Sequence, residues 1–319
     1  MRTHQSANPW LSRRRLLTGA AAVAAGLSLG SCRQDARTYS LGTAENRGFF
    51  FDFGLSLAAA VARSDAGFTL NPQITGGSVQ NITDIVAGRL DLALALADVA
   101  AATTERDTLR AVGRVYLNYL QFAVPADSPV HTLADLRGRT ISLGASSATT
   151  RAGGLLLEAA GLSESDVQVR AVPITEVLDA LASGDVEAAL FAGGVPHPEV
   201  DPSSGRGPAQ GIRLIDLSSY LPALQAKYGP VYQQVRLPVG LYGARDEVGS
   251  IGIASLLLAR ADLPDDVVGR IVDVLIDRSS ELVPPGTVGV QYLDTRSLIY
   301  TSGVPLHPGA AAAYRRHHR

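Results

Sequence analysis

Two segments about a hundred residues apart share one pattern, and this repeat constrains the fold more than any other feature of the chain. The segments are DIVAGRLDLALA, residues 84–95, and ALASGDVEAALFA, residues 180–192. Each reads as a helix end, a glycine that ends the helix, an acidic residue and an apolar strand. We interpret both as the corner of a β-α-β unit that the chain uses twice.

Strand-like and helix-like segments alternate along the rest of the chain, which is typical of α/β proteins. The strand-like RTISLGA, for example, is followed by the helix-like SATTRAGGLLLEAAG. Apolar strands that end near residue 124 and begin near residue 251 connect one α/β region to another. The sequence therefore predicts two lobes joined by two crossing segments. The expected bounds are 38–124 with 253–319 for the first lobe and 125–252 for the second.

The first 32 residues differ from the rest, and they indicate an export signal. Arginines precede an apolar run, residues 16–31, that contains no acidic residue. Arg13 and Arg14 lie in SRRRLLT, which resembles a twin-arginine motif, and Cys32 ends LGSC, which resembles a lipobox. A membrane-spanning helix is the alternative, but the run is short and rich in alanine and glycine. Cys32 is the only cysteine, so an internal disulfide is excluded and lipidation is its expected use.

The charge of the chain argues against some partners. The formal net charge is −2, and it becomes −6 when the signal is removed, because the signal contains four arginines and no acidic residue. A negative chain is a poor partner for nucleic acid or for an anionic membrane face. Hydrophobic residues make up 46% of the sequence, as in globular proteins. We expect an extracytoplasmic protein, lipid-anchored to the outer face of the cytoplasmic membrane through a short tether, residues 33–37.

Three turns rich in glycine or hydroxyl groups predict a cleft between the lobes. Each of them lies between a strand-like and a helix-like segment. The start of a helix has unpaired N–H donors and partial positive charge, so such turns suit an anion. The turns are GTAENRGFFFDFG (42–54), TGGSVQN (75–81) and GASSATTR (144–151). Ser78 in the second turn is expected to cap the helix that follows. The alternative for this turn is an ordinary capped helix without a ligand.

These motifs resemble the TAXI solute receptors, the extracytoplasmic binding subunits of one branch of the tripartite ATP-independent (TRAP) transporters. The similarity covers most of the chain after the signal. It implies a two-lobed α/β fold of the type II periplasmic-binding-protein class, a small carboxylate such as glutamate or glutamine as ligand, and a TRAP membrane subunit as partner. It rests on the first two turns and on DLALALADVAA, LADLRGRTISLGA, LLEAAGL, AGGVPHP and VPLHPGAAAAY. Phe50 and Phe51 stand where this family usually has tyrosines, so the wall of the predicted pocket is more apolar.

The residues expected to contact the ligand come mainly from the three turns. Backbone N–H groups of Gly77 and Ser78 are expected to hold an anionic group, and Asn81 either reaches the cleft or faces solvent. Arg47 and Arg151 are either surface residues or, if they point into the cleft, bidentate partners of a carboxylate. Consecutive phenylalanines point in different directions, so at least half of those at residues 49–53 are expected to be core, and Phe50 is favoured as the ligand contact. The full predicted set is Glu45, Asn46, Arg47, Phe50, Thr75, Gly77, Ser78, Asn81, Ser146, Ser147, Thr149, Thr150, Arg151 and Gly193.

Enzyme signatures are missing from the sequence. It has no P-loop motif, no GxGxxG after the first strand, no GxSxG after the predicted signal and no cysteine that could serve catalysis. The one GxSxG match, GLSLG at residues 26–30, lies in the apolar run of that signal. The histidines are isolated, so we expect no metal site and no cofactor. We predict a solute-binding lipoprotein that captures a small organic anion for a TRAP-type secondary transporter. The alternatives are a receptor that serves a sensor or an ATP-driven importer and, more distantly, an enzyme on the same two-lobed fold.

Overall fold

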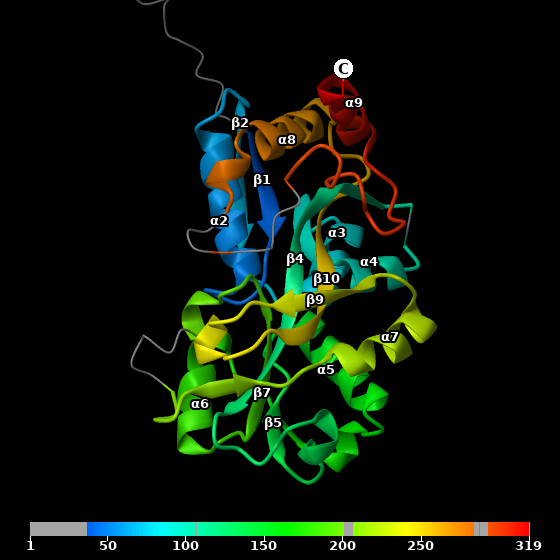
Figure 1. Cartoon of the computed structure of the whole chain (residues 1–319). Coiled ribbons are helices and arrows are strands. Elements are labelled where there is room, and N and C mark those ends of the chain that lie inside the picture. The colour runs from blue at the N-terminus through cyan, green and yellow to red at the C-terminus, as the bar shows by residue number, and fades with distance from the viewer. Residues whose placement is uncertain (1–36, 106, 201–206, 284–286, 288–292, 319) are drawn as a thin grey trace, which may run out of the picture. The chain divides into compact units, whose positions relative to one another are not determined.

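Ten strands form one sheet in the residues that the structure, a computed structural model, describes: 37–105, 107–200, 207–283, 287 and 293–318. The order is β2-β1-β3-β10-β4-β7-β5-β6, with β8 beside β4 and β9 beside β10 (Figure 1). The strands are β1 Arg37–Gly42, β2 Phe68–Gln73, β3 Leu92–Leu96, β4 Leu109–Pro125, β5 Thr140–Ser142, β6 Gln168–Arg170, β7 Ala188–Gly193, β8 Ile212–Leu214, β9 Tyr232–Leu237 and β10 Val248–Arg260. The helices are α2 Phe49–Ala62, α3 Ser78–Val86, α4 Ala97–Ala102, α5 Ser147–Ala159, α6 Val177–Ser183, α7 Leu221–Tyr228, α8 Asp265–Asp277 and α9 Pro308–His317.

Two groups of parallel strands define the two lobes, and the predicted two-lobed α/β fold is confirmed. In the first lobe β1 pairs in parallel with β2 and β3, and in the second β5 pairs in parallel with β6 and β7. β3 and β7 are the strands of the repeated sequence pattern. Their acidic residues both tie the strand to its parallel neighbour: the Asp91 carboxylate accepts a hydrogen bond from the N–H of Ser40 at 2.9 Å, and Glu187 forms an ion pair with Arg139. The pattern is therefore one β-α-β corner built twice.

The long antiparallel strands β4 and β10 connect the two groups (Figure 1). β10 pairs with β9 over residues 248–253 and with β3 over residues 255–259. β4 pairs with β10 over residues 109–119 and with β7 over residues 119–123. Both strands change neighbours close to the point where Asn118 lies opposite Ile253. Asn118 is thus placed between the lobes by the sheet itself. The lobe bounds expected from the sequence remain a prediction, since residues 37–319 form a single compact unit.

Aromatic packing fixes where α2 begins. Phe49, Phe50 and Phe53 lie on one face of this helix, and their ring centroids lie 4.7, 6.0 and 5.4 Å from that of Tyr116 on β4. All four side chains are buried. Offset and edge-to-face aromatic contacts of this kind add to the free energy of burial. The first turn of α2 is therefore held against β4, two residues from Asn118.

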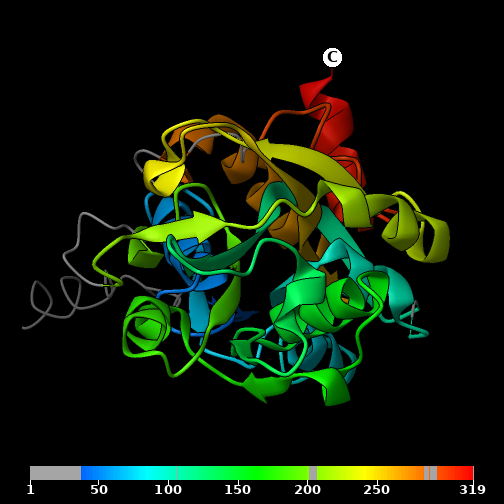
Figure 2. The same cartoon turned by 60° about the horizontal axis from the view of Figure 1, so that its bottom comes forward.

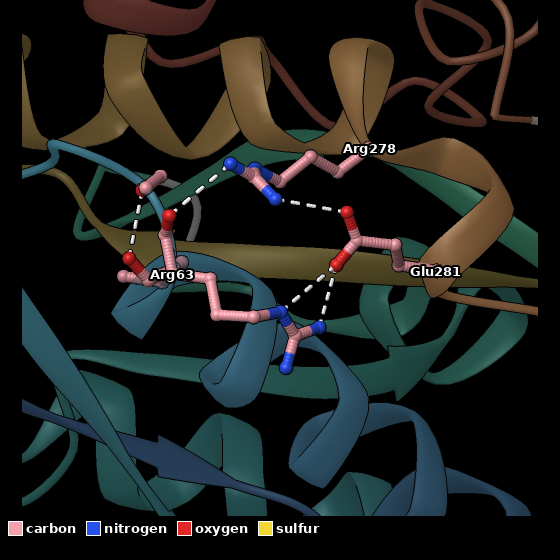
Figure 3. Close-up of polar contacts among 5 residues, drawn as sticks. Arg63, Arg278 and Glu281 are labelled. Atoms are coloured by element: carbon pink, nitrogen blue, oxygen red, sulfur yellow. Dashed lines mark hydrogen bonds and ion pairs between the residues drawn. The ribbon is translucent and has the colours of Figure 1, made fainter.

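The last helices of the chain return to the first lobe, where α8 packs against α2 and α9 packs against α8 (Figure 1). Figure 3 shows Glu281 between Arg63, which follows α2, and Arg278, which follows α8. Its carboxylate accepts from the Arg63 guanidinium at 2.5 Å and from that of Arg278 at 2.9 Å. Pro264 is the residue before α8, which begins at Asp265.

The second lobe, drawn mainly in green, comes forward in Figure 2. Across the described residues, none of the helices has the length and apolar character that a membrane crossing needs. Arg13, Arg14 and Cys32 lie outside the described residues.

Candidate functional site

Three helices begin around one cavity between the lobes. Its walls include Gly48 and Phe50 at the start of α2, Ser78 at the start of α3, and Thr149 in the first turn of α5. β7 and the loop after it supply the opposite wall. The centres of water molecules can occupy about 40 Å³ of this cavity. One water needs roughly 10–15 Å³ on this measure, so the cavity has room for a few waters or for one small molecule.

The helix starts present unpaired backbone donors to this cavity. Within the described residues, no hydrogen bond is made by the N–H groups of Phe49, Phe50, Ser78 and Ala148, and all four residues line the cavity. The first N–H groups of a helix lack partners inside the helix, and the helix dipole adds partial positive charge there. No lysine or arginine is among the described lining residues. The positive potential of the site therefore comes from backbone groups.

The turn that precedes α3 has a conformation that requires glycine. Gly77 has φ +89° and ψ −159°, a region that is essentially restricted to glycine. Its N–H donates to the Thr75 hydroxyl at 3.2 Å. This conformation turns the carbonyl of Gly76 toward α5, where it accepts from the N–H of Ser147 at 3.0 Å. The Ser147 hydroxyl in turn accepts from the N–H of Val79 at 3.3 Å. The starts of α3 and α5 are thus hydrogen-bonded to each other.

Ser78 and Asn81 have structural roles that the sequence did not predict. Ser78 does not cap α3: it is the first helical residue, and its buried hydroxyl accepts from the N–H of Leu96 at 3.0 Å. Asn81 neither lines the cavity nor faces solvent, so both alternatives for its position were wrong. Its side-chain N–H₂ group donates to the carbonyls of Thr43 at 2.6 Å and Leu94 at 2.8 Å. The buried amide therefore joins β1, α3 and β3.

The predicted residues divide into those that line the cavity and those that do not. Six of them line it: Glu45, Phe50, Gly77, Ser78, Ser146 and Thr149. Eight others do not: Asn46, Arg47, Thr75, Asn81, Ser147, Thr150, Arg151 and Gly193. Phe49 lines the cavity together with Phe50, so Phe50 is not the only phenylalanine at the site. Gly193 lies behind the wall, where an added Cβ would approach His197 to 2.9 Å and Phe49 to 3.3 Å.

Both candidate arginines are engaged by acidic residues. Arg47 lies 2.5 Å from the carboxylate of Glu199, whose side chain is 8% exposed, so this ion pair connects the start of α2 to the second lobe. Arg151 lies 3.5 Å from Asp98, which also accepts from the Tyr232 hydroxyl at 2.9 Å. Burial raises the pKa of Asp98, and the Tyr232 hydrogen bond and the Arg151 charge oppose this shift. Neither arginine lines the cavity.

Glu45 is the acidic residue of the cavity wall. Its carboxylate accepts from the N–H of Ile174, which belongs to the second lobe, at 3.2 Å. Burial raises the pKa of Glu45, and this hydrogen bond opposes the shift. The side chain therefore takes up a proton more readily than an exposed glutamate, and a second negative charge in the cavity would favour that protonation further.

Asn118 and His197 line the cavity although the sequence did not predict them as ligand contacts. Asn118 is 6% exposed, and its Oδ1 atom has no hydrogen-bond partner in the described residues. His197 is 1% exposed, and burial lowers its pKa to about 4, so the ring is neutral near pH 7. Its Nδ1 atom accepts from the N–H of Glu199 at 3.3 Å. The only sequence signal for His197 was its place in AGGVPHP, and Asn118 had none beyond being polar within an apolar strand.

The fold and the cavity define a two-lobed α/β protein with a cavity between its lobes. The chain belongs to the NMT1-like family, whose model matches residues 41–317.

Solved structures agree with this fold at low sequence identity. XAC2383 from Xanthomonas citri, bound to chloride ion, is similar to this chain with a TM-score of 0.50 and 15% identity, over 88% of this chain and 99% of that one. The same protein bound to ATP matches with a TM-score of 0.50 and 16% identity over the same shares. The periplasmic aliphatic sulphonate binding protein SsuA from Escherichia coli matches with a TM-score of 0.43 and 16% identity, over 88% of this chain and 78% of that chain. The two XAC2383 matches show a shared fold, and identities this low do not identify a ligand.

Proposed function

We propose that the protein is an extracytoplasmic binding protein that captures a small organic anion in the cavity where α2, α3 and α5 begin. The observation that carries this proposal is the convergence of three helix starts, with four unpaired N–H groups, on one cavity. Backbone donors and helix dipoles bind an anion without the cost of burying a cationic side chain. The volume of the cavity limits the ligand to a small molecule.

Two features of the site agree with capture and release. The cavity is bounded by residues of both lobes, so a ligand that binds there contacts both. Polar contacts join the lobes beside it: Ser147 with Gly76 and Val79, Glu45 with Ile174, Arg47 with Glu199, and Arg151 with Asp98. The hydrogen bonds among them contribute only about 0.5–1.5 kcal/mol of net free energy each, which suits lobes that separate to exchange a solute. Our proposal for the binding site is the six residues of the predicted set that line the cavity, extended by Phe49, Asn118 and His197.

The proposal is tested by comparing an acid with its amide. Full-length protein is unfolded in guanidinium, refolded to remove any bound solute, and titrated in a calorimeter with lactate and with lactamide. We expect heat of binding for lactate and at least about a tenfold weaker affinity for lactamide, since the amide has no charge to place at the helix starts. Equal affinity for the two compounds would show that the cavity does not select an anion.

The membrane partner is the second part of the proposal. Following the resemblance to TAXI receptors, the protein would deliver its solute to a TRAP-type secondary transporter and would be anchored by lipid at Cys32. An ATP-driven importer or a sensor would use the same capture step. Uptake of radiolabelled solute by cells separates these cases: an ionophore that dissipates ion gradients abolishes uptake through a secondary transporter, whereas an ATP-driven importer keeps working while ATP is maintained. In each case the protein binds and does not transform its solute.

A further inference from the structure

We propose that the cavity is built for a small 2-hydroxy carboxylate, whose hydroxyl group binds to Asn118 and His197. This inference rests on the proposed capture of an organic anion, and it specifies the chemical group next to the carboxylate. It starts from two buried polar side chains that line the cavity and have unused hydrogen-bonding atoms.

Asn118 is the first of the two buried polar side chains. Its side chain lines the cavity from the crossing of β4 and β10, its Oδ1 atom is buried without a partner, and no hydrogen bond of its Nδ2 atom is present in the described residues. Other buried amides of this protein are paired: Asn81 donates to two carbonyls, and Gln121 accepts from Tyr242 and donates to the carbonyl of Gly194. An unpaired buried amide costs free energy. A ligand that pairs with Asn118 recovers this cost.

His197 is the second buried polar side chain with an unused hydrogen-bonding atom. Its Nδ1 atom accepts from the N–H of Glu199, so the proton of the neutral ring lies on Nε2. Nε2 has no hydrogen-bond partner in the described residues, although the ring lines the cavity. The backbone holds the ring in place, since the N–H of His197 donates to the Tyr242 hydroxyl at 2.7 Å and that hydroxyl donates to Gln121 at 3.0 Å. His197 is thus a preorganised donor.

The two side chains together require a particular ligand group. An amide has one acceptor atom and one donor group in either orientation, and the imidazole adds a second donor. A hydroxyl group has one donor and two acceptor sites, so it can donate to Oδ1 of Asn118 and accept from Nε2 of His197, which leaves Nδ2 of Asn118 for another acceptor of the ligand. An ammonium group has no acceptor, a keto group has no donor, and a methyl group has neither. The small volume of the cavity places this hydroxyl close to the carboxylate, as in a 2-hydroxy acid.

Four compounds with the same carbon skeleton test the inference. Refolded full-length protein is titrated with lactate, propionate, pyruvate and alanine, which differ in the group at the second carbon. We expect the dissociation constant of lactate to be at least about tenfold lower than those of the other three, since one or two hydrogen bonds are at stake. If propionate, pyruvate or alanine binds as tightly as lactate, the inference is wrong, while the capture of an anion stands. If none of the four binds, both the inference and the proposed function fail.

Variants separate ligand recognition from a structural role. Asn118→Leu should reduce the preference for lactate over propionate to about twofold or less, while the melting temperature of the ligand-free protein stays the same or rises, because an unpaired amide has been removed. Asn81→Leu is the matched control, and it should lower the melting temperature because its amide is bonded to two carbonyls. His197→Phe should also reduce the preference, and His197→Gln, which keeps a donor, should retain part of it. An Asn118→Leu variant that melts lower and keeps the preference for lactate would overturn the inference.

Discussion

The N–H group of Ser147 donates a hydrogen bond to the carbonyl oxygen of Gly76 at 3.0 Å. This bond joins the first residue of α5 in the second lobe to the turn before α3 in the first lobe. Both turns were predicted as ligand sites from sequence, but their outer residues bond to each other, while Gly77, Ser78 and Ser146 line the cavity beside this bond. The lobes are therefore in contact at the rim of the cavity.

Gly77→Ala should weaken both folding and solute binding. Gly77 has φ +89° and ψ −159°, and an added Cβ would lie 3.4 Å from Ser146 and Ser147 across the rim of the cavity. Strain in such a region costs about 1–3 kcal/mol. We expect lactate affinity to fall at least about tenfold in calorimetry. Gly88→Ala is the control, because Gly88 also has a positive φ, +72°, but an added Cβ there would meet nothing within 4 Å. It should lose stability and keep affinity, so equal affinity in the two variants would contradict the prediction.

Glu45→Gln should strengthen the binding of an anion. The Glu45 carboxylate lines the cavity, and a ligand carboxylate in the same cavity is repelled by its charge. Calorimetry near pH 7 should show a severalfold lower dissociation constant for lactate in the variant. Burial already raises the pKa of Glu45, so lowering the pH should strengthen binding to the wild type and have less effect on the variant. Weaker binding by Glu45→Gln would indicate that the ligand presents a cation or a donor to this residue.

Arg47→Gln should destabilise the protein by about 1–3 kcal/mol. The Glu199 side chain is 8% exposed, so removing its partner leaves a mostly buried carboxylate with less compensation. Urea unfolding measures the change. Arg236→Gln is the matched control, because Arg236 and Glu247 form an ion pair whose side chains are 70% and 50% exposed. Exposed pairs contribute about 0–1 kcal/mol. If Arg47→Gln lowers the free energy of unfolding as little as the control does, Arg47 does not stabilise the Glu199 carboxylate.

His197 should make the folded state less stable in acid. Burial lowers its pKa from 6.5 to about 4, and the charge of Glu199 opposes this shift. Between these two values the unfolded chain binds a proton that the folded protein does not, so the free energy of unfolding falls as the pH drops from 6.5 toward 4. The full effect is on the order of 3 kcal/mol. Urea unfolding of wild type and His197→Gln near pH 7 and near pH 4.5 should show the larger loss in the wild type. The same loss in both proteins would mean that His197 titrates normally.

Cys32→Ser should release the protein from the membrane or leave its signal uncleaved. The basis is the lipobox-like LGSC and the absence of any other cysteine in the chain. Membrane fractionation and the mass of the mature chain measure the outcome in cells. Retention of a normally processed Cys32→Ser protein in the membrane fraction would show that lipid at this residue is not the anchor.

Local sequence patterns were enough to predict the main elements of the fold. The repeated corners at residues 84–95 and 180–192 became β3 and β7 with the helices before them, because helix ends, glycines and short apolar strands are encoded by neighbouring residues. The three predicted turns also lie at helix starts, since α2, α3 and α5 begin within them. Helix starts and tight turns depend on residues a few positions apart, and such signals can be read along the chain.

Only the tertiary structure decided which of these residues face the cavity. Arg47 meets Glu199 and Asn81 meets two backbone carbonyls, so side chains that were expected at the ligand are used to hold the fold. Asn118 reaches the cavity because β4 crosses between the lobes at that residue, and His197 reaches it from a loop that the sequence left without a function. A side chain in a predicted turn binds whichever partner lies nearest in space, and that partner can be more than a hundred residues away, as Glu199 is from Arg47. The sequence determined where the helices beside the cavity begin, and the packing of the two lobes decided which of their described atoms remain unpaired there.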